Sequence, residues 1–162
     1  MRIPVAFLAI AASTASVAGQ GRPITQPFAI EISANTPTVK AGSGVVIGIR
    51  LTNNSDELLG CGRAYNDMTG QDEIFIIEVR DDHGHLTPKR VYPHPELAGG
   101  SAVTLGCDLK RGETLTDSQD VARIYDMTRP GRYVIQVSRP VSFADKKAGV
   151  VKSNKVTVTI VP

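Results

Sequence analysis

The chain has 162 residues, with 18 basic and 16 acidic side chains, no Trp, four Phe and four Tyr. Nucleic-acid binding needs clustered Lys and Arg, and so does a polybasic membrane surface, so this near-neutral balance argues against both. The few aromatic side chains also argue against stacking platforms for sugars or single-stranded nucleic acid.

The N-terminus has the three parts of a secretory signal peptide. Arg2 supplies the positive charge, residues 3–12 (IPVAFLAIAA) are apolar, and residues 16–18 (SVA) fit a signal peptidase site. Roughly ten apolar residues are too few for a membrane-spanning helix, which needs about 20. We predict cleavage between Ala18 and Gly19, or at a neighbouring bond. The mature protein would then be periplasmic or extracellular, without a further membrane span.

Apolar and polar side chains alternate with a period of two in five segments, which predicts five strands. In chain order these segments are residues 28–34, 45–52, 75–80, 133–138 and 155–160. Each strand would have one apolar face and one polar, solvent-exposed face, as two packed antiparallel sheets require. Weaker strands are expected at residues 85–92, 101–105 and within 113–124, and one helical turn near residues 120–125.

Turn chemistry separates these segments. Residues 81–84 (DDHG) predict a hairpin turn with Gly84 at positive φ, and residues 110–113 (KRGE) predict a tight turn. Three connections, at residues 57–72, 93–100 and 143–150, are long.

Long connections in compact domains are often binding sites, although a plain surface loop is the alternative for each. The connection at residues 57–72 is the best candidate because it contains Cys61. A pair of cysteines in an exported chain is read as a disulfide. A bridge from Cys61 to Cys107 would close a loop of about 47 residues, for which the chain-entropy account gives roughly 4 kcal/mol. The alternative is two free thiols.

The stretch before the fourth predicted strand, residues 126–133 (DMTRPGRY), resembles a turn in bacterial immunoglobulin-like domains. In those domains a Pro-Gly turn precedes a Tyr whose hydroxyl bonds back to nearby backbone. The motifs NNSDE, RDDHGH, RGETL and RPGRYVIQV are similar in order to the BsuPI-type proteinase inhibitor domain, over roughly residues 45–138. The resemblance implies a structural corner at Pro130, Gly131 and Tyr133. The chain departs from antibody-like domains because it lacks the core Trp.

Pattern and resemblance together predict an all-β protein. We expect an immunoglobulin-like antiparallel β-sandwich of about seven or eight strands over residues 27–162. It would follow a signal peptide at residues 1–18 and a short extension at residues 19–26.

Residues that could carry chemistry are few. His83, His85 and His94, with Asp81 and Asp82, could bind zinc or copper, but a polar hairpin tip explains the first two equally well. Residues 41–44 (AGSG) lack the spacing of a nucleophile elbow. Phosphate-binding glycine loops are absent from the sequence. Residues 53–55 (NNS) fit an N-glycosylation pattern, which a bacterial exporter would usually leave bare.

We therefore assign no catalytic, cofactor-binding or metal-binding residue. The expected function is a monomeric, non-enzymatic module that binds a protein or a cell-envelope polymer. It would bind through loops at one end of the sandwich or through an edge strand. A BsuPI-like proteinase inhibitor is the alternative within the binding class. A small metal-dependent or hydrolytic enzyme is the alternative from another class.

Overall fold

The computed structural model describes residues 26–61, 63–66, 71–72, 74–90, 103–141 and 149–162. The predicted signal peptide and its cleavage site at Ala18 and Gly19 lie outside these residues, as do His94 and the 93–100 connection. Within the described ranges, no helix is long and apolar enough to span a bilayer.

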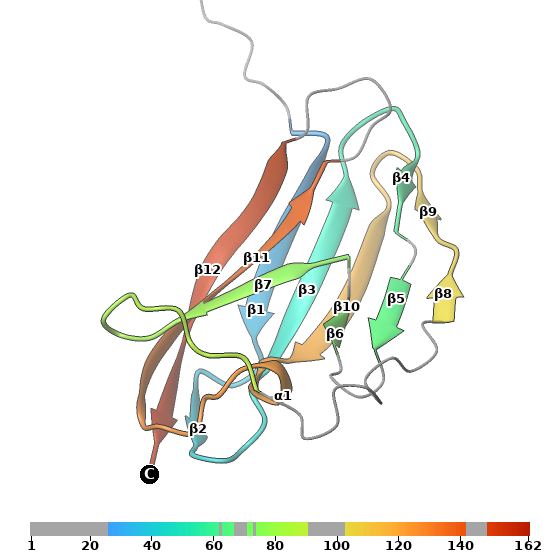
Figure 1. Ribbon diagram of the computed structural model, residues 1–162. Coiled ribbons are helices and arrows are strands. Elements are labelled where there is room, and N and C mark those ends of the chain that lie inside the picture. Colours follow the sequence, from blue (N-terminus) through green and yellow to red (C-terminus); the bar gives the residue numbers. More distant parts are fainter. Residues whose placement is uncertain (1–25, 62, 67–70, 73, 91–102, 142–148) are drawn as a thin grey trace, which may run out of the picture.

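Two sheets form the body of the molecule (Figure 1). The first has the order β1-β3-β10, with β1 (Phe28–Ala34), β3 (Val46–Asn53) and β10 (Thr114–Asp120). The second has the order β2-β12-β11-β7, with β2 (Thr38–Lys40), β12 (Val150–Val161), β11 (Gly131–Pro140) and β7 (Ile76–Arg80). Every pairing in these sheets is antiparallel except that of β2 with β12. One helical turn, α1 (Val121–Ile124), follows β10. The prediction of an all-β fold is confirmed.

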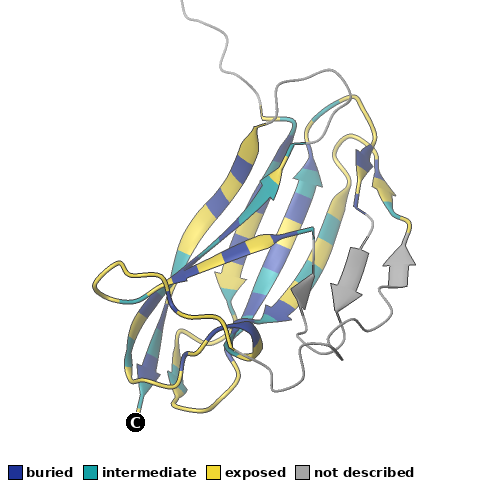
Figure 2. Cartoon of the chain, viewed as in Figure 1, coloured by how far each residue is buried: buried dark blue, intermediate teal, exposed yellow. Residues whose placement is uncertain are grey.

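The buried faces of the two sheets meet in one hydrophobic core (Figure 2). Buried and exposed residues alternate along the strands, as the period-two pattern predicted. Four aliphatic side chains from four different strands are at most 5% exposed: Ile47, Ile77, Ile135 and Val158. The strands therefore bury the faces that the sequence pattern predicted.

The 57–72 connection contains three short strands, β4 (Leu59–Gly60), β5 (Arg63–Asn66) and β6 (Gln71–Asp72). Strand β5 pairs with β6 and with β8 (Val103–Leu105), and β4 pairs with β9 (Asp108–Leu109). The register of β4 with β9 continues unchanged into that of β5 with β8. These four strands thus form one antiparallel ribbon, in which Cys61 and Cys107 lie opposite each other.

The disulfide predicted between these cysteines is present, with Cα atoms 4.8 Å apart. Cys61 is fully buried in the core, and its backbone N–H donates to the Cys107 carbonyl at 2.6 Å. The bridge therefore joins the two sides of the ribbon, β4 and β5 on one side and β8 and β9 on the other, and it anchors the ribbon to the core.

The predicted strand at residues 85–92 is wrong over its described part. Residues 85–90 form only two isolated bridges, from Leu86 to Arg80 and from Lys89 to Tyr125. Pro88 has no N–H to donate to a ladder, and the chain leaves β7 to meet the end of α1. There the Arg90 N–H donates to the Ile124 carbonyl at 2.8 Å.

Candidate functional site

The two large sheets have four outer edges, and the middle of the β1 edge is covered by a side chain from the other sheet. The Asn154 amide of β12 lies against Ile32. Its Oδ1 accepts from the Ile32 N–H at 2.8 Å, and its Nδ2 donates to the Ile32 carbonyl at 2.9 Å. One side chain thus occupies both outward-facing backbone groups of Ile32, as a neighbouring strand would.

The edge of β7 is closed by the segment that follows it and by a tyrosine. The Thr87 N–H donates to the Val79 carbonyl at 2.9 Å, and the Tyr125 hydroxyl donates to the Ile77 carbonyl. Burial, and then the nearby charge of Glu78, raise the pKa of Tyr125 above its usual value. At the opposite edge of this sheet, β2 has only three residues, and short edge strands are poor templates for pairing.

Among the residues that the structure describes, strand β10 is the open edge, without a hydrogen-bonded strand on its outer side. The Asn53 N–H donates to the Glu113 carbonyl at 3.1 Å, and the Val121 N–H donates to the Val45 carbonyl at 2.8 Å. In an antiparallel ladder, the backbone N–H and C=O groups of successive residues point alternately toward and away from the partner strand. The backbone groups of the odd-numbered residues of β10 therefore point toward β3. The outward-facing backbone groups therefore belong to even-numbered residues, Thr114, Thr116 and Ser118.

Nothing in the described part of the chain bonds to these outward-facing groups of β10. The Thr114, Thr116 and Ser118 side chains are exposed. The pairing with β3 has no bulge. The sequence of β10, TLTDSQD, has neither Pro nor Lys, two residues that protect natural edge strands from pairing. Among the described residues, this edge therefore has neither a partner strand nor those two protective residues.

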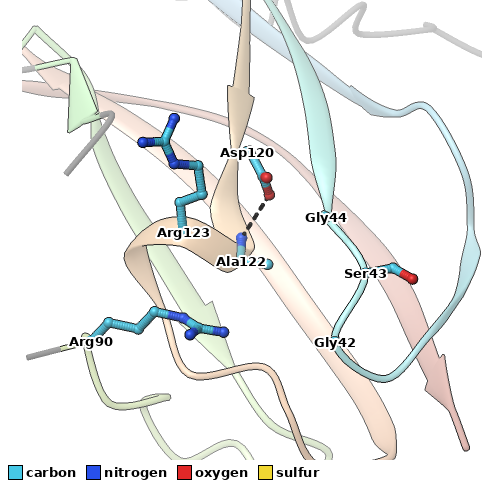
Figure 3. A pocket seen from close by; sticks show the side chains of 7 residues that line it. All are labelled: Gly42, Ser43, Gly44, Arg90, Asp120, Ala122 and Arg123. Carbon is cyan, nitrogen blue, oxygen red and sulfur yellow. Dashed lines mark hydrogen bonds between the residues drawn. The ribbon is translucent and has the colours of Figure 1, made fainter. Parts of the chain in front are cut away.

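A hollow of about 290 Å³ lies where β10 passes into α1 (Figure 3). Its lining comes from three separate parts of the chain: Gly42, Ser43, Gly44, Arg90, Asp120, Ala122 and Arg123. The hollow is thus formed by the loop before β3, the segment after β7 and the start of α1.

Asp120 holds these parts together. Its Oδ1 accepts from the Val45 N–H at 2.9 Å and from the Ala122 N–H at 3.1 Å, so it caps α1. A Cβ atom on Gly44 would lie 2.9 Å from Asp120 Oδ2. Gly44 is therefore needed for the close approach of this carboxylate.

The histidines proposed as metal ligands lie at a hairpin tip. His83 Nε2 is 3.5 Å from Asp82 Oδ1, and His85 Nδ1 is 3.6 Å from Asp81 Oδ2; both imidazoles are exposed. Gly84 has the predicted positive φ, at +81°. Within the residues that the structure places, no group of three or more His, Cys, Asp or Glu side chains gathers as a metal site would require.

Asp81 organises this tip. Its Oδ1 accepts from the backbone N–H groups of His83 at 3.0 Å and His85 at 2.8 Å. Desolvation acts to raise the pKa of Asp81, but hydrogen bonds from His85 and then His83 lower it below the usual value. The carboxylate has a structural role in the turn.

The predicted corner and the glycosylation pattern are both in described residues. The Tyr133 hydroxyl donates to the Arg129 carbonyl at 2.9 Å, across the turn that contains Pro130 and Gly131. Asn53, in contrast, is fully buried, with its Nδ2 donating to the Leu109 carbonyl at 2.8 Å. A glycan on Asn53 would have to break that bond.

Sequence reasoning missed the residues that define these features. Asn154 and Tyr125 lie outside the five patterned segments, and neither has a local signal for an edge contact. From the sequence, residues 41–44 are a turn without the spacing of a nucleophile elbow, whereas in the structure Gly42, Ser43 and Gly44 line the hollow. An available signal was Asp120 directly before an apolar turn, because Asp at that position is a common helix cap.

Comparison with known proteins adds no further assignment to this geometry. No protein-family model matches the chain, and no curated protein matches it.

Proposed function

We propose that the chain is an exported, non-enzymatic immunoglobulin-like module that binds a protein by adding an extended segment to strand β10. The signal-peptide pattern supports export. Two sheets around one core and the Tyr133 corner support the immunoglobulin-like assignment. The observation that carries the binding function is the open edge of β10, since among the described residues the other three large-sheet edges are partly covered or short.

The chemistry of the edge favours a polypeptide over a polymer of sugars. Outward N–H and C=O groups alternate along β10 at the spacing of another β-strand. In this binding mode main-chain hydrogen bonds provide affinity, at about 0.5–1.5 kcal/mol net for each bond. The exposed Thr and Ser side chains add the hydrogen-bonding pairs that are favourable across neighbouring strands.

The test removes one outward N–H group and leaves the pairing with β3 intact. In Thr116→Pro, the lost N–H is one that points away from β3, and edge strands tolerate proline in that position. Thr116→Val, the matched control, keeps the N–H and removes only the hydroxyl. We expect the mature protein to retain a partner from its native envelope as wild type or as Thr116→Val, and to lose it as Thr116→Pro.

Capture of a partner is not sufficient, so hydrogen exchange supplies the second readout. The amides of Thr116 and Ser118 should exchange rapidly in the free protein and become protected in the complex. Equal retention of the partner by the Pro and Val variants, or a complex in which both amides stay unprotected, would refute strand addition at β10.

Proteinase inhibition is a second candidate, supported by the hairpin after β7. This hairpin protrudes from the sheets in Figure 1. It is held by the two bonds to Asp81 and by a bond from Arg80 Nη1 to the Gly84 carbonyl at 2.8 Å. If this tip fills a protease cleft, the mature protein should inhibit a secreted protease, and Asp81→Ala should weaken the inhibition. No inhibition across a panel of secreted proteases would exclude this function.

A further inference from the structure

We infer that the hollow at the end of β10 binds a small zwitterion, with its carboxylate on Arg90 and its ammonium group on Asp120. This site lies at the end of β10, beyond the outward-facing groups of Thr114, Thr116 and Ser118, and it does not depend on strand addition there. The evidence is a pair of opposite charges that line one hollow without neutralising each other.

Each charged group is only partly used within the described chain. Asp120 Oδ1 accepts two backbone hydrogen bonds, whereas Oδ2 has no hydrogen-bond partner there. Arg90 donates from Nε to the Tyr125 carbonyl at 3.3 Å, while its two terminal nitrogens have no hydrogen-bond partner among the same residues. After the hydrogen bonds from Thr128, the charge of Arg90 also helps to lower the pKa of Asp126. No salt bridge joins Arg90 to Asp120.

Both groups are held in place by the fold, so they cannot easily close the gap between them. Asp120 is fixed by the backbone N–H groups of Val45 and Ala122. Arg90 is fixed by its backbone bond to Ile124 and by its Nε bond to Tyr125. In the view of Figure 3 the Arg90 guanidinium lies in the space below α1, and the Asp120 carboxylate lies above Ala122 at the start of α1.

The chemistry of the two groups defines the ligand. A guanidinium presents parallel donors that match a carboxylate, and a carboxylate oxygen accepts from an ammonium group. The hollow, at about 290 Å³, is slightly smaller than the 300–1,000 Å³ that is usual for ligand pockets. It therefore suits an amino acid or a very short peptide. The guanidinium of Arg123, which also lines the hollow, points away from Asp120 in Figure 3.

An NMR titration of the mature protein with three probes tests this inference. Glycine carries both charges, acetate only the negative one and methylammonium only the positive one. We expect glycine to shift the backbone amides of residues 42–44 and of Ala122, and expect the two singly charged probes to shift them far less. Equal shifts with acetate would overturn the inference in favour of a simple anion site. No shift, at concentrations that would saturate a Kd of about 10 mM, would overturn it altogether.

Two variants test whether Asp120 binds the ammonium group and Arg90 binds the carboxylate. Asp120→Asn keeps an oxygen to cap α1, since Asn caps as well as Asp, but removes the negative charge. Arg90→Gln removes the positive charge. We expect each to weaken glycine binding about tenfold, the effect of losing one charged hydrogen bond. Arg132→Gln, at an exposed position on β11, is the control and should leave binding unchanged. Unchanged binding in both Asp120→Asn and Arg90→Gln would contradict the assignment.

Discussion

Two asparagine side chains take the place of backbone partners in this fold. Asn154 satisfies Ile32 from the opposite sheet. Asn53 closes the end of β3, where its Nδ2 also donates to the Glu57 carbonyl at 2.7 Å and its Oδ1 accepts from the Ser55 N–H at 2.9 Å. A side-chain amide has both a donor and an acceptor, so it can end a strand or cover an edge where no further strand follows.

Tyr125 closes an edge with a hydroxyl, and its titration provides a test. Burial and the charge of Glu78 raise its folded-state pKa above the ordinary value of about 10. At a pH between these two pKa values, the Tyr125 hydroxyl is deprotonated in the unfolded chain and still protonated in the folded chain. The contribution of the protonated Tyr125 hydroxyl to folding stability is therefore complete below about pH 10, and it is lost as the pH rises through the folded-state pKa.

We expect Tyr125→Phe to lower the free energy of unfolding by about 1–3 kcal/mol at neutral pH, because the buried Ile77 carbonyl loses its donor. The same variant should lose less stability than wild type between neutral and strongly alkaline pH. Urea unfolding at a series of pH values measures both effects. If the two proteins had parallel stability profiles into the alkaline range, the hydroxyl would not be the titrating group.

At the scale of elements, the ribbon of β4, β5, β8 and β9 depends on its disulfide. These strands have two to four residues each, and an isolated pair of strands is marginal in water. The bridge joins opposed positions 46 residues apart in sequence, and it supplies the constraint that the short strands lack.

Replacing both cysteines by alanine should lower the free energy of unfolding by about 2–4 kcal/mol. Part of that loss would come from the buried Cys61 sulfur. The measurement is urea unfolding of the double variant and of the wild type without reductant. A local readout distinguishes the ribbon from the core: amides of β4 and β9 should lose protection from exchange, while those of β3 and β11 should keep theirs. Uniform loss of protection would mean that the ribbon and sheets unfold as one unit.

These elements also show what local pattern can predict. Segments such as residues 28–34 and 45–52 have a full alternation of large side chains, so their strands and buried faces were predicted correctly. Strand β4 has two residues, too few to show any alternation of apolar and polar side chains, and its pairing depends on the distant Cys107. The contact of Asn154 with Ile32 spans 122 positions. The lining of the hollow comes from residues 42–44, 90 and 120–123, which only the folded chain brings together.

At the scale of the molecule, both sheets bury their apolar faces in a single core. Ile47 of β3 and Ile135 of β11 come from different sheets, and each is 0% exposed. Neither sheet can keep its apolar face buried without the other sheet. The two sheets are therefore expected to unfold together in one cooperative transition.

Truncation of a buried isoleucine from either sheet tests this cooperativity. Ile47→Ala and Ile135→Ala should each lower the free energy of unfolding by about 2–5 kcal/mol, through lost burial and the cavity left behind. Each should move the urea midpoint without changing the slope m, because the surface exposed on unfolding stays the same. Ile76→Ala is the matched control, since Ile76 is 52% exposed on the outer face of β7 and its loss should cost little. Two separate transitions in either buried-site variant would show that each sheet has a core of its own.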